Sequence, residues 1–98
     1  MTNMAENVGV RVVIDGTHFN IMVDDVWPLG TPARQPYQEA ADALVSENYC
    51  PAGTIVDMTS IRHMSTNEKI LPMNPDMPLT EPVVLYVKVL WWHLRVAA

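Results

Sequence analysis

The histidines and the single cysteine are the residues of this sequence with the most versatile chemistry. His18, His63 and His93 fall in three separate segments. Zinc and iron sites usually show His and Cys ligands in close pairs, with about two to four residues between them, and the sequence contains no such pair. Cys50 directly precedes Pro51, and no local signature supplies the positioned base that a nucleophilic thiol needs. We therefore expect no metal ion, no cofactor and a partly buried structural thiol.

Acid–base catalysis and phosphate binding find equally little support. Paired carboxylates can divide acid and base roles when their pKa values are pushed apart, but Asp57 falls in an apolar strand and Glu68 and Asp76 in loops. The glycines stand singly, at positions 9, 16, 30 and 53, and form no phosphate-binding loop. We expect no catalytic residue and no small-molecule substrate, so the chain is interpreted as not being an enzyme.

Aromatic residues and methionines point instead to protein binding. Adjacent strand residues face opposite sides of a sheet, so only one of Trp91 and Trp92 can enter a core. The other, with Tyr86 or Leu85 on its own side, is a candidate interface anchor. The alternative is that the second Trp packs on the N-terminus or on the loop 72–82. Methionines are adaptable at binding surfaces, and the alternative for them is filling gaps in a small core. The interface candidates are Tyr86, Trp91, Trp92, Met58, Met64, Met73 and Met77.

Composition and charge restrict the class of protein. The chain has 98 residues, 49% of them hydrophobic and 17% charged, with a net charge of −5, which fits a single domain over 1–98. The basic residues are scattered, which argues against nucleic-acid and anionic-membrane binding. Residues 1–10 show no signal-peptide pattern, and the longest apolar run, Val83–Trp92, is too short to span a bilayer. We expect an acidic, cytoplasmic protein.

The first half of the sequence predicts a hairpin and a helix. Apolar residues alternate on both sides of Asp15-Gly16, a dipeptide favoured in type I′ turns, so Val8–Asp24 is predicted to form an antiparallel hairpin. Residues 25–35 are predicted to be a connection. Apolar residues then recur at helical spacing from Pro36, a residue suited to a first helical turn, to about Tyr49.

The second half predicts strands separated by a proline-rich loop. Residues 53–61 are rich in β-branched side chains and predict a third strand. Residues 65–67 predict a turn, 68–71 a short strand, and 72–82 a loop with four prolines. Val83–Trp92 is apolar on both faces, which is typical of a strand at the centre of a sheet. A helix can cover only one of these faces, and the other is then covered by loops or by a partner.

This order of elements resembles the ubiquitin-like β-grasp, an α+β fold with a mixed sheet of four to five strands and one helix packed across one face. Three stretches, Ile61–Thr66, Ile70–Pro72 and Asp76–Glu81, are also similar to the second half of the small B (gamma) subunit of toluene-type multicomponent monooxygenases. The resemblance implies a non-catalytic accessory subunit of a larger bacterial complex, with a diiron hydroxylase as the larger protein partner.

Two other functions stay open at this point. Ubiquitin-like modifiers and sulfur carriers need a C-terminal Gly-Gly, which can thread a narrow enzyme channel where any Cβ would clash. This chain ends in Leu94-Arg95-Val96-Ala97-Ala98, so the glycines are absent. The second alternative is a small acidic inhibitor that occupies a basic groove, which the net charge permits.

Overall fold

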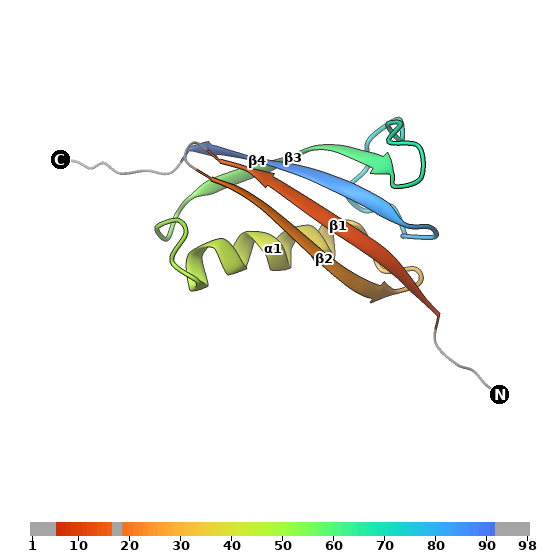
Figure 1. Cartoon of the computed structure of the whole chain (residues 1–98), viewed down its shortest axis with the longest axis horizontal. Helices are drawn as coiled ribbons and strands as arrows, with labels where there is room; N and C mark the ends of the chain where they lie inside the picture. The colour runs from red at the N-terminus through yellow and green to blue at the C-terminus, as the bar shows by residue number, and fades with distance from the viewer. Residues whose placement is uncertain (1–5, 17–18, 92–98) are drawn as a thin grey trace.

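The computed structural model of the chain describes residues 6–16 and 19–91. In this part the chain forms one helix and a mixed sheet of four strands (Figure 1). The elements are β1 (Asn7–Asp15), β2 (Asn20–Pro28), α1 (Arg34–Ser46), β3 (Ile55–His63) and β4 (Val83–Trp91). The strand order is β2-β1-β4-β3, with β1 and β4 parallel and the outer pairs antiparallel. The predicted α+β class, with one helix on a mixed sheet, is confirmed.

The predicted hairpin forms, but its turn differs from the prediction. Asp15 belongs to β1 and pairs with Asn20, and the Gly16 N–H donates to the Phe19 carbonyl, so Asp15-Gly16 is not the turn of the hairpin. Gly16 lies outside the left-handed region, which excludes the expected type I′ turn. A Cβ on Gly16 would come within 2.6 Å of the Phe19 ring, so this glycine is explained by close packing.

Helix α1 begins at Arg34, two residues before Pro36 and inside the predicted connection, and it ends earlier than predicted. Pro36 lies in the first turn, where its missing N–H costs no hydrogen bond. Asn48 has φ 66°, and the N–H groups of Asn48 and Tyr49 donate to the carbonyls of Val45 (3.1 Å) and Leu44 (2.8 Å). This is a Schellman motif, and it stops the helix at Ser46 instead of Tyr49. In the described part of the chain, no helix is long and apolar enough to cross a membrane.

The segment after β3 forms the predicted turn but not the predicted short strand. Asn67 has φ 65° and its N–H donates to the His63 carbonyl. Of the expected strand at 68–71, the structure has a single bridge, between Arg62 and Lys69. Pro72 follows and has no N–H with which to extend the pairing. The loop up to residue 82 returns to the start of α1, where the Ala33 N–H donates to the carbonyl of Met77.

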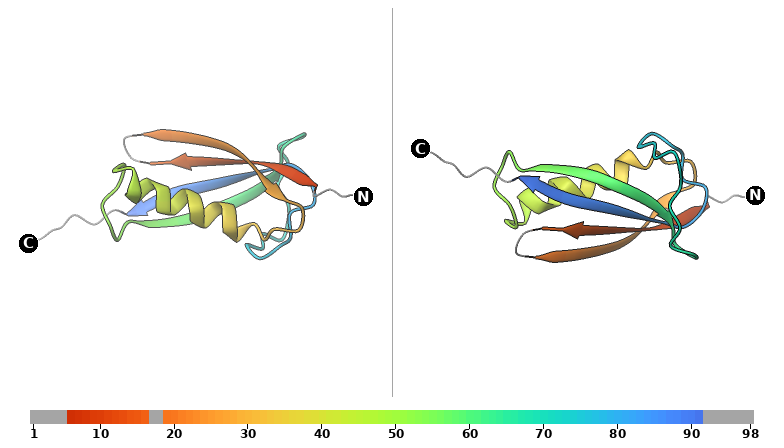
Figure 2. Two further views of the ribbon diagram at one scale, coloured as in Figure 1. Left: turned by 90° about the horizontal axis from the view of Figure 1, so that it is seen from below. Right: turned by 90° about the horizontal axis from the view of Figure 1, so that it is seen from above.

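Strand β4 is central, as predicted, between β1 and β3. Its side chains facing α1, from Val83 to Val89, are buried. The core that they form with the helix and the other strands also includes Val8, Val10, Val12, Ile14, Ala40, Leu44, Met58, Ile61 and Leu79. Figure 2 shows α1 on one side of the sheet; in the right-hand view the sheet lies in front of it, with no described helix or strand over its other side.

Candidate functional site

The side of the sheet away from α1 is the candidate site, and we call it the open face. Alternation along the strands and the cross-strand register assign to it Arg11, Val13, Met22, Asp24, Val26, Asp57, Ser60, Arg62, Val84, Tyr86, Lys88 and Leu90. This face carries exposed apolar residues because both faces of β4 are largely apolar, whereas α1 covers only one of them.

Apolar side chains form a row across the middle of the open face. Val13 pairs with Met22 on one side and with Tyr86 on the other. Met22 is 59% exposed and Leu90, further along β4, is 53% exposed. Met22 lies next to Val13, and Val13 next to Tyr86, the latter two half-buried, and adjacent apolar residues at the surface mark interaction sites more often than single ones do.

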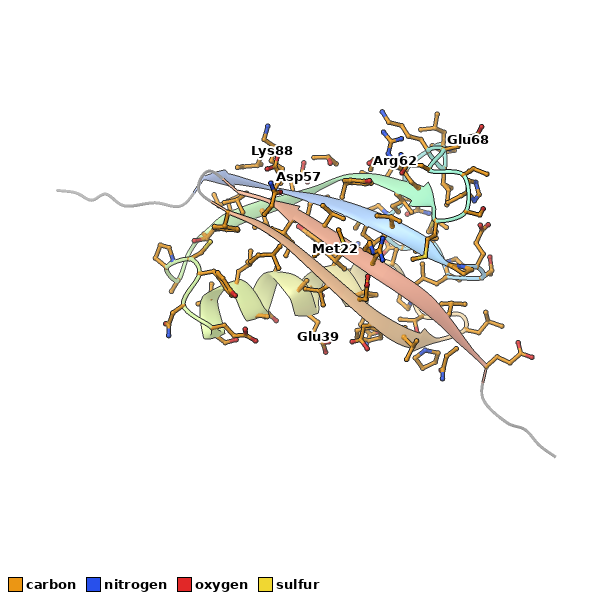
Figure 3. All side chains as sticks on the ribbon, viewed as in Figure 1. Met22, Glu39, Asp57, Arg62, Glu68 and Lys88 are labelled. Atoms are coloured by element: carbon orange, nitrogen blue, oxygen red, sulfur yellow. The ribbon has the colours of Figure 1, made fainter. Side chains whose placement is uncertain are left out.

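Charged residues surround this apolar row. The Arg11 guanidinium donates to both carboxylate oxygens of Asp24, at 2.7 and 3.1 Å. This hydrogen-bonded pair lowers the pKa of Asp24 and raises the pKa of Arg11. Lys88 lies opposite Asp57 in the register of β3 and β4, and Figure 3 shows Lys88 and Arg62 projecting from the side of the sheet away from α1. The open face therefore has an apolar centre and a charged rim.

Tyr86 is held in a fixed position on the open face. The Arg62 guanidinium lies 5.5 Å from the centroid of the Tyr86 ring, a cation–π distance. Arg62 also donates to the carbonyl of Asn67 at 2.7 Å, and the Tyr86 hydroxyl lies 3.5 Å from the Asn67 side-chain oxygen. A shallow polar hollow lies at this position, and it is lined by Arg62, Asn67 and Tyr86 together with Thr59, Ser60 and Lys69. Such an ordered aromatic side chain loses little conformational entropy when it binds a partner.

The structure separates the predicted interface residues. Tyr86 lies on the open face, but Met58 is only 3% exposed and lies in the core on the α1 side of β3. Met77 packs against the core, Met64 is half-buried and Met73 is exposed in the loop. The methionines therefore form no single surface with Tyr86. The side chain of Trp91 and all of Trp92 lie outside the described part.

Sequence reasoning missed Val13, Met22 and Leu90 as open-face residues. The signal was present in the alternation of β1, β2 and β4, because each strand carries apolar residues at positions of both parities. Only the cross-strand register shows that Val13 and Met22 lie side by side, with Tyr86 on the other side of Val13.

The titratable groups in the described residues offer little for catalysis. Burial raises the pKa of the Cys50 thiol, and it raises the pKa of Tyr37, whose hydroxyl donates to the Val56 carbonyl at 3.1 Å. His63 and Glu81 form one close pair, Nδ1 to Oε1 at 2.7 Å. Among the described residues, no group of three or more His, Cys, Asp or Glu side chains could hold a metal ion. His18 and His93 lie outside them.

Comparison of the chain with protein-family models, with curated proteins and with solved structures finds no match. The residues 94–98, on which the modifier alternative depends, lie outside the described part. The geometry of the sheet and helix is therefore the basis for assigning a function.

Proposed function

We propose that this chain is a non-catalytic protein-binding domain of the ubiquitin-like β-grasp type, and that its open face docks on a larger protein. The order β2-β1-β4-β3, with its parallel central pair, supports the fold assignment. The order along the chain supports the fold assignment as well, because α1 follows the hairpin of β1 and β2 and precedes β3.

The observation that carries the proposal is the exposed apolar row on the open face. A central strand normally has both faces covered, yet Leu90 of the central strand β4 is 53% exposed. On the edge strand β2, Met22, which pairs with Val13, is 59% exposed. The cores of protein interfaces are apolar and rich in aromatic residues and Met, with a charged and polar rim. The open face has this composition, with Tyr86 near its centre.

In its narrower form, the proposal makes the chain an accessory subunit of a bacterial multicomponent diiron monooxygenase, docked on the hydroxylase. The sequence resemblance to the small subunit supports it. Two of the resembling stretches are neighbours in space: His63 Nδ1 lies 2.7 Å from Glu81 Oε1, and the Met64 N–H donates to the carbonyl of Pro82, directly after the last stretch, at 3.1 Å. They meet at the end of β3, and the first of them includes Arg62 of the open face.

Site-specific photocrosslinking in the native cells tests the docking proposal. A photoreactive phenylalanine analogue at Tyr86 is expected to crosslink the chain to a larger protein. The same analogue at Gln38, which is exposed on α1, is the matched control and is expected not to crosslink. Crosslinking at Gln38 but not at Tyr86, or at neither position, would show that the open face is not the docking surface. A hydroxylase subunit as the crosslinked protein supports the narrower form, and any other larger protein contradicts that form alone.

A further inference from the structure

Strand β2 is an unpaired edge of the sheet in the described part of the chain. It pairs with β1 only. The Gly16 N–H donates to the Phe19 carbonyl and the Leu29 N–H to the Glu6 carbonyl, in the register of the hairpin. Because hydrogen-bonded pairs alternate in an antiparallel ladder, the backbone groups of Asn20, Met22 and Asp24 point away from β1. A strand could add there.

An apolar groove runs beside this edge, between β2 and α1. It has a volume of about 180 Å³, and apolar side chains from both elements line it, including Ile21, Val23, Ala40, Ala43 and Leu44. A site for one water needs only about 10–15 Å³, so the groove has room for apolar side chains. Figure 2 (left) shows α1 crossing the sheet with β2 along one side of it.

The edge and the groove have matching periodicity. An added strand would hydrogen-bond to the outward backbone groups of β2, and its side chains would alternate between the two sides of the sheet. Every second side chain would then lie on the α1 side, next to Ile21 and Val23, over the groove. This is the geometry of peptide recognition by strand addition.

The charges around the groove define the partner. Asp25, Glu39 and Glu47 line it and are exposed, and Figure 3 shows Glu39 projecting from α1. None of the Lys and Arg residues that the structure describes lines the groove. A ligand with Lys or Arg next to its apolar residues would therefore be complementary.

A second copy of the chain fits this edge poorly. Antiparallel pairing of two β2 strands about their midpoint, Asp24, would bring the exposed Asp25 of one copy near that of the other. Like charges on adjacent strands are destabilising, whereas Asp24 itself is ion-paired with Arg11. Acidic residues on an edge strand also oppose self-association in general.

We propose that the edge of β2 and the groove beside α1 bind an extended segment of another protein, with apolar residues at alternate positions and flanking Lys or Arg. This surface lies at the β2 edge and on the α1 side of the sheet, so the proposal does not depend on docking through the open face.

The test begins with a display library of random peptides nine residues long, the length of β2, selected against the full chain. We expect enrichment of β-branched or aromatic residues at alternate positions and of Lys or Arg near the ends. On titration with a selected peptide, the backbone amides of Met22 and Asp24 should shift in NMR spectra and gain protection from hydrogen exchange.

Two pairs of variants assign the binding to the edge and the groove. Replacing both Glu39→Lys and Glu47→Lys should weaken peptide binding about tenfold at low salt. The control double variant Asp42→Lys, Glu68→Lys makes the same change of four charge units at exposed residues outside the groove and should change binding less than about threefold. Met22→Pro removes an outward N–H of β2 and should abolish peptide binding, whereas Met22→Ala retains this N–H and is its control. If Met22→Pro fails to fold, the charge variants alone decide the test.

Three results would overturn the proposal. Selected peptides without alternation would exclude strand addition, and amide shifts confined to the open face would place the ligand there. Shifts in β2 that depend on protein concentration without peptide would identify a second copy as the occupant.

Discussion

Leu85 and Leu90 offer the sharpest test of the layered arrangement, because they are the same residue type on opposite faces of β4. Leu85 is fully buried, with 0% of its surface exposed, whereas Leu90 on the open face is 53% exposed. Leu85→Ala deletes a fully packed side chain, which costs about 2–5 kcal/mol of the free energy of unfolding. Full burial of a Leu side chain stabilises by about 1.5–3 kcal/mol, so Leu90→Ala, at half burial, should cost about 1 kcal/mol or less.

Urea unfolding followed by circular dichroism measures both costs. With an m value of about 1–2 kcal/mol/M, a loss of about 3 kcal/mol lowers the midpoint for Leu85→Ala by about 1.5–3 M. The midpoint for Leu90→Ala should fall by less than about 1 M. Equal losses at unchanged m would mean that the open face is covered in the isolated chain, which would refute the reasoning that assigns it to a partner.

Three further predictions concern single groups. Burial raises the pKa of Cys50, so its thiol should react with a disulfide reagent at pH ~8 far more slowly in the folded chain than in urea. The arginine partners lower the pKa values of Asp24 and Asp76. Their contribution to stability is therefore present above the unfolded value of about 3.9 and is lost as pH falls through the lower folded values. Thermal unfolding between pH ~5 and ~2 should show a smaller loss in the double variant Asp24→Asn, Asp76→Asn than in the wild type. Asn48 has φ 66°; Asn48→Val should lower the free energy of unfolding by about 1–2 kcal/mol, while Asn48→Gly should leave it unchanged or raise it.

The element order is predictable because the hydrophobic pattern is local and strong. Alternation on both sides of Asp15 defines the hairpin, and apolar residues at helical spacing after Pro36 define α1. The two apolar faces of β4 indicate a central strand, since near-continuous apolar runs are typical of strands that lie in the middle of a covered sheet.

The features that the sequence did not predict depend on contacts between distant residues. Residues 25–28 resemble a loop because of Trp27-Pro28, yet they continue β2. Pro28 stands at a position whose N–H would point away from β1, so it breaks no bond of the hairpin. The continuation of the hairpin pairing beyond Asp15 likewise involves the Phe19 ring, which packs over Gly16.

The candidate site was only partly predictable for the same reason. Tyr86 could be named from the composition of its strand, but the side of the sheet on which Met58 lies depends on the register between β3 and β4, which has a shift between Met58 and Ser60. The groove beside α1 could not be predicted, because it depends on the distance between the helix and β2. No local sequence pattern determines the distance between these two elements.

The central claim is that the chain docks on a larger protein through its open face. The most direct test is size-exclusion chromatography after mild extraction from the cells that produce the chain natively, which gives the apparent molecular mass of the particle that contains it. We expect the wild-type chain to elute in a complex much larger than its own 11.0 kDa, with a larger protein present in a fixed ratio. The variant Met22→Asp, Tyr86→Asp, which places charges in the apolar row but leaves the core intact, should elute as the free chain. Elution of the wild type as a free monomer, or an unchanged complex with the variant, would contradict docking through the open face.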